Sequence, residues 1–163
     1  MSGMDAKAWI SVGAAGISIL AMILSWAAAA RARNVSVGSL ETSIRSAISQ
    51  TRGAVRAIAL QIASASDGKT EKELQVPAQQ RRLEPLRQIF SEAVEDNLNA
   101  YEDACAKYLD KKIDRERFKK MYSEEIRGLC TNTKAPTAEM LHPESTSKFR
   151  AIWKVYRMWH VHE

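Results

Sequence analysis

The chain has 163 residues and a net charge of +5 at neutral pH, with 11 aromatic residues. The charge is 0, +4, −4 and +5 over residues 1–30, 31–66, 67–110 and 111–163, and nucleic acid is not expected as a partner because a binder usually concentrates its positive charge more strongly. Few aromatics and many Ala, Glu, Lys and Arg residues favour an all-α protein over a sheet protein, with room for one small domain.

The first predicted element is a transmembrane helix over residues 8–30, after a short tail of residues 1–7. No charged residue interrupts these 23 positions, which as a helix span about 34 Å and exceed the roughly 30 Å hydrocarbon core of a bilayer. Residues with a preference for the membrane interface flank the span: Trp9, Trp26, Arg31 and Arg33. We therefore expect a single-pass protein bound to the lipid bilayer of the inner membrane.

Basic residues predict the orientation of this span. Lys7 is offset by Asp5 before the span, whereas five arginines and one glutamate lie in residues 31–66. The positive-inside rule then places the amino terminus outside and the carboxyl-terminal body in the cytoplasm. The alternative is a signal peptide cleaved after the alanines of residues 27–30, followed by export.

Small residues form a stripe along one face of the span, at steps of three and four: Ser11, Ala14, Ser18, Ala21, Ser25 and Ala28. Small side chains allow helices to approach closely in lipid, so the stripe predicts a homo-oligomer. The alternative is that alanine and serine simply fill a moderately hydrophobic anchor.

An amphipathic stalk helix is predicted over residues 31–66, with a break between Asn34 and Gly38 or none at all. Its arginines, Arg45, Arg52 and Arg56, occupy the polar side and are expected to be solvated or to contact anionic lipid headgroups. Asp67 and Gly68 end the helix, and residues 67–82 have the composition of a linker.

A helical bundle of about three helices is predicted over residues 83–163. We expect its first helix to begin near Glu84 and Pro85, its second to be capped by Asp114, and its last to be capped by Ser145 or Ser147. The apolar positions at helical spacing predict a core made of Leu86, Phe90, Leu98, Tyr101, Phe118, Tyr122, Ile126, Phe149, Trp153 and Tyr156.

The residues that most often carry chemistry form no recognisable constellation. Cys105 and Cys130 fall on the apolar faces of two predicted helices and are interpreted as reduced core thiols. The three histidines lie in a predicted loop or near the carboxyl terminus, far in sequence from either cysteine. We therefore predict that the chain is not an enzyme and holds no cofactor or metal.

Three segments carry a resemblance to a known family: NLNAYEDACAKYLD over residues 97–110, IDRERF over residues 113–118 and MYSEEIR over residues 121–127. Together with the helices around them, residues 83–159, they resemble a family of uncharacterised single-pass bacterial and prophage membrane proteins. The resemblance implies a membrane-tethered helical domain linked to a prophage or to phage defence, and it implies no catalytic residue.

These patterns predict a non-enzymatic interaction or scaffold module. The span and stalk associate laterally, and the distal bundle meets a cytoplasmic protein partner. The alternative is a membrane-perturbing effector or toxin whose transmembrane helices assemble and breach the bilayer.

Overall fold

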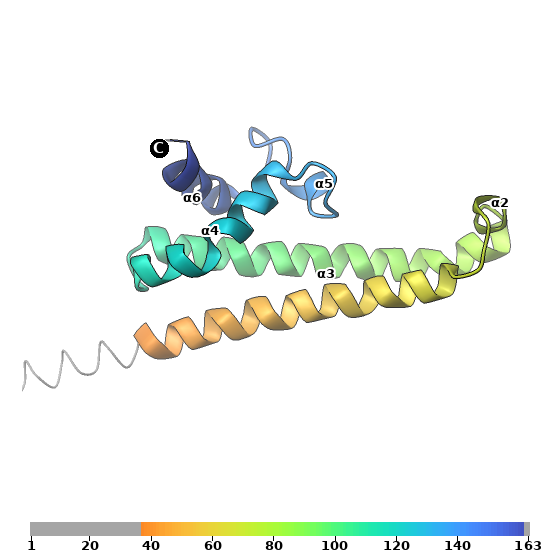
Figure 1. Cartoon of the computed structure of the whole chain (residues 1–163), viewed down its shortest axis with the longest axis horizontal. Helices are drawn as coiled ribbons and strands as arrows, with labels where there is room; N and C mark the ends of the chain where they lie inside the picture. The colour runs from red at the N-terminus through yellow and green to blue at the C-terminus, as the bar shows by residue number, and fades with distance from the viewer. Residues whose placement is uncertain (1–36, 162–163) are drawn as a thin grey trace, which may run out of the picture. The chain divides into compact units, whose positions relative to one another are not determined.

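The computed structural model describes residues 37–161, and within this range every regular element is a helix. A helix over residues 37–66 is followed by the short α2 (Glu71–Leu74), the long α3 (Pro77–Leu109), α4 (Arg115–Thr131), the short α5 (Ala138–Leu141) and α6 (Arg150–His160). Figure 1 shows this order along the chain. The expected all-α class is confirmed for the described part of the chain.

The predicted transmembrane helix, its interfacial residues and its small-residue stripe lie outside the described residues. Between residues 37 and 161, no helix combines the length and the apolar character that crossing a membrane requires. The chain divides into two compact units, Met1–Leu40 and Glu41–Glu163. Of the first unit only residues 37–40 are described, and they are helical.

In the second unit, residues 41–66 run beside α3 with the opposite chain direction (Figure 1). Ile44 and Ile48 are buried on the inner side of this helix, 5% and 2% exposed, and the Thr51 hydroxyl accepts a hydrogen bond from the Asn97 amide of α3 at 2.9 Å. The stalk helix therefore contributes to the core beside the bundle, although the sequence analysis separated the two by a linker.

The linker predicted over residues 67–82 is largely helical, which corrects the sequence interpretation. The helix of residues 37–66 does end before Gly68, whose φ of +68° suits a residue without a side chain. Immediately afterwards, Thr70 and Glu73 cap α2 reciprocally, with the Thr70 amide donating to Glu73 Oε2 at 2.7 Å and the Glu73 amide to Thr70 Oγ1 at 3.4 Å.

The start of α3 also differs from the prediction of Glu84 and Pro85. The helix begins at Pro77, two turns earlier, and Pro85 lies inside it. Both prolines suit helical φ angles, and Pro77 occupies the first turn, where a missing amide hydrogen costs nothing. The result is a helix of 33 residues.

Of the N-caps predicted for the two later long helices, one is confirmed and one is wrong. Asp114 caps α4 as predicted, because its side chain accepts from the Arg117 amide at 3.0 Å. Neither Ser145 nor Ser147 caps α6; its N-cap is Phe149, which makes no capping hydrogen bond through its side chain. The Glu102 carboxylate of α3 takes that role across the core, as described below.

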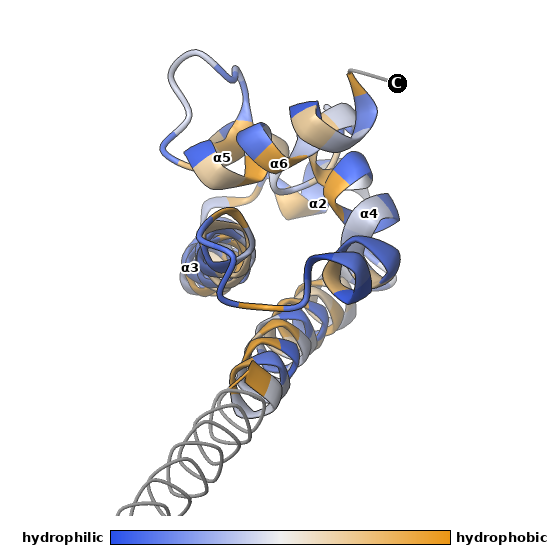
Figure 2. Cartoon of the chain, turned by 90° about the vertical axis from the view of Figure 1, so that its left-hand side faces the viewer, coloured by the Kyte–Doolittle hydropathy of each residue, from blue (hydrophilic) through white to orange (hydrophobic). Residues whose placement is uncertain are grey.

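The core lies where α6 packs against both α3 and α4. Seven of the ten predicted core residues are buried, namely Leu98, Tyr101, Phe118, Tyr122, Ile126, Phe149 and Trp153, whereas Leu86, Phe90 and Tyr156 are partly exposed. Trp159 and Tyr108 add an edge-to-face ring pair at 5.1 Å between centroids. Figure 2 shows the alternation of hydrophobic and hydrophilic residues around the helices that produces this burial.

Candidate functional site

The two thiols are core groups rather than nucleophiles. Cys105 and Cys130 are buried and free. Burial is the main cause that raises the pKa of Cys105 well above its ordinary value, and the same cause, followed by the nearby Glu144 carboxylate, raises the pKa of Cys130 to about 12. Since a thiolate is the reactive form, both side chains are inert at neutral pH.

A serine and a histidine approach one another between α4 and α6, but their geometry opposes catalysis. His160 Nε2 lies 3.3 Å from Ser123 Oγ and also 3.3 Å from the Ser123 carbonyl oxygen. Because a carbonyl oxygen only accepts, the contact with it favours the tautomer in which Nε2 carries the hydrogen. That nitrogen cannot then take the proton of the Ser123 hydroxyl.

The His, Cys, Asp and Glu side chains of residues 37–161 do not gather into a metal-ligand set. Residues 37–161 contain no group of three or more His, Cys, Asp or Glu side chains close enough to share an ion. A structural or catalytic metal needs such a set of ligands. A network of partly buried polar contacts lies elsewhere, where three helices meet.

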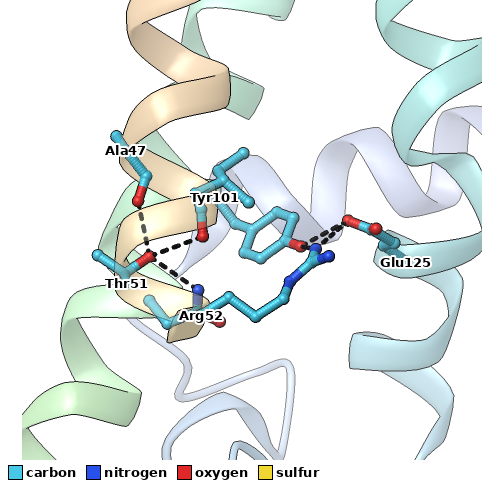
Figure 3. A network of polar contacts seen from close by, with 7 residues as sticks. Ala47, Thr51, Arg52, Tyr101 and Glu125 are labelled. Carbon is cyan, nitrogen blue, oxygen red and sulfur yellow. Dashed lines mark hydrogen bonds and ion pairs between the residues drawn. The ribbon is translucent and has the colours of Figure 1, made fainter. Parts of the chain in front are cut away.

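This meeting point, which we call the polar junction, consists of Arg52, Tyr101 and Glu125 (Figure 3). Arg52 comes from the helix of residues 37–66, Tyr101 from α3 and Glu125 from α4. The Arg52 guanidinium donates to Glu125 Oε2 at 2.5 Å and also to the Tyr101 hydroxyl oxygen, and that hydroxyl donates to the same carboxylate oxygen at 2.6 Å. A single oxygen of Glu125 on α4 therefore bonds to the helix of residues 37–66 and to α3.

The electrostatics of the junction keep each group in the form that these contacts require. Burial, followed by the hydrogen bond to Glu125, raises the pKa of Tyr101, so its hydroxyl stays protonated as a donor. The hydrogen bond to Glu125 is also the main cause that raises the pKa of Arg52. Charge-assisted hydrogen bonds of this kind are roughly twice as strong as neutral ones.

A second polar contact lies one turn away from the junction. The Thr51 hydroxyl donates to the Ala47 carbonyl at 2.9 Å (Figure 3) and accepts from the Asn97 amide at 2.9 Å. Asn97 is only 9% exposed, so this bond satisfies an amide that would otherwise be buried without a partner. Together these contacts fix the position of residues 41–66 against α3 and α4.

An open groove of about 480 Å³ borders the junction between residues 45–56 and α4. Its lining includes Arg45, Ser49, Arg52, Gly53, Arg56, Met121 and Glu125. With three arginines and one glutamate, the groove carries a net charge of +2. The Arg52 charge is compensated by Glu125, which leaves two uncompensated guanidinium groups on the groove.

These two outer arginines lack strong acceptors. Arg45 donates to the Met121 sulfur at 3.4 Å, and a thioether is a weak acceptor. Within residues 37–161, Arg56 contacts no acidic side chain. A Cβ placed on Gly53, which lies between Arg45 and Arg56, would meet nothing within 4 Å. The groove therefore presents two arginines to an incoming acidic group and has space between them.

Sequence reasoning located the arginines but not their roles. It interpreted Arg45, Arg52 and Arg56 as a solvated or lipid-facing stripe, whereas Arg52 is an internal partner of Glu125, 73 positions away. Tyr101 and Tyr122 were predicted as core residues; both are buried, and they also border the junction or its groove. In the sequence, Arg52 follows the buried Ile44 and Ile48 at steps of four residues, the spacing of an apolar position, and this local signal indicates an inward side chain without identifying its partner.

Comparisons of the chain with family models, curated proteins and solved structures give no match. The resemblance of residues 83–159 to single-pass bacterial and prophage membrane proteins therefore remains a prediction. The candidate site is accordingly defined by geometry alone, as an arginine-lined groove next to a fixed polar junction.

Proposed function

We propose that this chain is a non-enzymatic, membrane-anchored interaction module. In this proposal residues 8–30 hold it in the inner membrane, with the carboxyl-terminal helices in the cytoplasm. The uncharged length of residues 8–30 and the arginines that follow it support the anchor and its orientation.

The observation that carries the interaction role is the groove beside the polar junction. Arg52 is fixed by two hydrogen bonds, and Arg45 and Arg56 lie on either side of it with no carboxylate partner among the described residues. Preorganised charged groups cost little to order when a partner binds and favour a partner of opposite charge. An acidic protein surface fits this description better than a small apolar ligand does.

The anchor is tested by fractionating cells that express the full chain. We expect the protein in the membrane pellet after ultracentrifugation, and in the supernatant after Ile19→Lys with Leu24→Lys, because each lysine near the centre of a span costs about 3 kcal/mol on an insertion scale. Ile152→Val is the control, because it changes a residue outside the anchor, and this variant should remain in the membrane pellet. Full-length, uncleaved protein in the supernatant of unmutated cells would overturn the proposal.

The interaction role is tested separately with the arginines of the groove. Arg45→Glu with Arg56→Glu should abolish the binding of an acidic protein surface to the groove. The helical circular dichroism signal should stay unchanged, because both side chains are exposed. If every protein contact of the full chain survives this change, the groove is not the interaction surface.

A further inference from the structure

Two stripes of opposite charge in this chain share one spacing. On the helix of residues 37–66, Arg45, Ser49, Arg52 and Arg56 lie at positions i, i+4, i+7 and i+11. On α3, Glu92, Asp96, Asn99 and Asp103 lie at the same four offsets. Residues at these offsets share one face of a helix, so we call the two faces the arginine stripe and the acidic stripe.

The charges of the two stripes match more completely in one relative direction than in the other. Starting from the carboxyl-terminal end of the arginine stripe, the arginines are separated by steps of four and then seven residues, from 56 to 52 to 45. From the amino-terminal end of the acidic stripe, the carboxylates are separated by the same steps, from 92 to 96 to 103. Two antiparallel helices therefore bring all three pairs level over about 16 Å. Parallel helices bring only two pairs level, because they place Arg52 opposite Asn99.

The acidic stripe is available for such a contact. Glu92, Asp96, Asn99 and Asp103 are all exposed, while the opposite side of the same helix is buried through Val94, Leu98, Tyr101 and Cys105. Glu92 accepts from the neutral Gln88 side chain at 3.2 Å, and Asp103 pairs with Lys107 one turn later on the same helix. Among residues 37–161, Asp96 has no ion-pair partner.

The partner follows from this complementarity. We propose that the arginine groove binds the acidic stripe of a second copy of this chain, in antiparallel orientation, with Arg56 opposite Glu92, Arg52 opposite Asp96 and Arg45 opposite Asp103. Arg52 keeps its bond to Glu125 and adds a weaker contact with Asp96, and this central pair is the one that favours the antiparallel over the parallel orientation. The lack of a side chain at Gly53 leaves room for the incoming carboxylates.

This contact joins two different surfaces, which has a consequence for the assembly. Each copy offers both an arginine stripe and an acidic stripe, so two copies can engage reciprocally, or further copies can add head to tail. The inference rests on the proposed interaction role and identifies its partner, but it does not depend on the membrane anchor.

The first experiment measures self-association of the full chain, purified in a mild detergent, by sedimentation at 0.05 M NaCl. Arg45→Glu with Arg56→Glu should weaken association by about tenfold or more, because two attractions become repulsions. Glu92→Lys with Asp103→Lys should do the same, and an equimolar mixture of the two variants should associate again. The matched control for the arginine variant, Arg81→Glu with Lys154→Glu, lowers the net charge by the same amount at exposed positions outside both stripes and should leave association unchanged.

The second experiment reads the register by disulfide formation between copies. Arg56→Cys in one tagged copy should cross-link to Glu92→Cys in another, whereas Arg45→Cys should not cross-link to Glu92→Cys. The native thiols interfere little because Cys105 and Cys130 are buried and protonated. Equal yields of both cross-links would overturn the antiparallel register.

Other outcomes separate this inference from the proposed function. If the mixture of charge-reversed variants fails to associate, the stripe contact is wrong even when the protein remains in the membrane fraction. If the arginine variant loses binding to vesicles containing anionic lipid but keeps its self-association, the groove serves lipid, and the second copy is excluded as its occupant. If the protein leaves the membrane fraction but the cross-links form, the anchor alone is wrong.

Discussion

Glu102 of α3 caps the amino-terminal end of α6 across the core, and we predict that this contact is a main stabilising link between the two helices. Its two carboxylate oxygens accept from the Ala151 and Ile152 amides at 2.8 and 3.0 Å. These are two of the four amides that a helix leaves without internal partners. The residue at the N-cap, Phe149, makes no capping bond with its side chain, so Glu102 is the side chain that fills this role.

The change to make is Glu102→Gln, which keeps the size of the side chain but removes the charge and one acceptor oxygen. Losing a cap costs about 0.5–2 kcal/mol, and losing the favourable interaction of the charge with the helix dipole costs a further 0.3–1 kcal/mol or so. We therefore expect a loss of about 1–3 kcal/mol in the free energy of unfolding. Glu102→Ala removes both acceptors and should cost at least as much.

The assay is urea unfolding of the full chain in detergent, followed by circular dichroism of the helices and by tryptophan fluorescence. Glu84→Gln is a matched control, because it removes a carboxylate from an exposed position on the same helix, outside the acidic stripe, where the ion pair is with Arg87 one turn away. The control should change stability by less than about 0.5 kcal/mol. Equal midpoints for Glu102→Gln and Glu84→Gln would show that the cap contributes little, and the reasoning would be refuted.

Three further changes test the junction, a buried thiol and the groove. Tyr101→Phe removes the hydroxyl that donates to Glu125 and should lower the free energy of unfolding by about 1–2 kcal/mol in urea titrations, whereas no change would mean that Arg52 alone holds the carboxylate. The pKa of Cys130 is raised in the folded state from 9.0 to about 12, so the protonated thiol contributes fully to stability below pH 9 and this contribution is lost as the pH rises toward 12. Cys130→Ala should therefore reduce the fall in the free energy of unfolding between pH 9 and 12, and the same fall in the variant would contradict the raised pKa. Gly53→Ala should raise stability by about 0.5–1 kcal/mol, since a Cβ there meets nothing within 4 Å, and a lower thermal midpoint would show that the groove is tighter than described.

Local signals were sufficient to predict some parts of this fold. Gly68 after a long amphipathic stretch and Asp114 three residues before Arg117 act on backbone groups within one turn, so a sequence window contains all the residues involved. The same argument explains the confirmed burial of Leu98 and Ile126, which follow the helical repeat. Helix ends and core faces of this kind depend on neighbours close in sequence.

The features that sequence reasoning missed depend on residues far apart. Glu102 caps a helix that begins 48 positions later, and Arg52 pairs with a carboxylate 73 positions away. Residues 67–82 were misread for a different reason: their Gln, Pro and charge content suggested a linker, although the Thr70 and Glu73 pair is itself a helix-start signal. The first two errors needed tertiary information, and the third did not.

The polar junction also limits how the helix of residues 41–66 can slide along its neighbours. Ile44 and Ile48 are one turn apart and chemically identical, so a shift of about 5.4 Å would place Ile48 near the site of Arg52 while another isoleucine still filled the apolar contact. Such a shift would separate the Arg52 guanidinium from the partly exposed Glu125 carboxylate and would leave the buried Asn97 amide without the Thr51 hydroxyl, and an unsatisfied buried amide is costly. The apolar contacts thus stabilise the packing of this helix in more than one register, and the polar contacts favour one register.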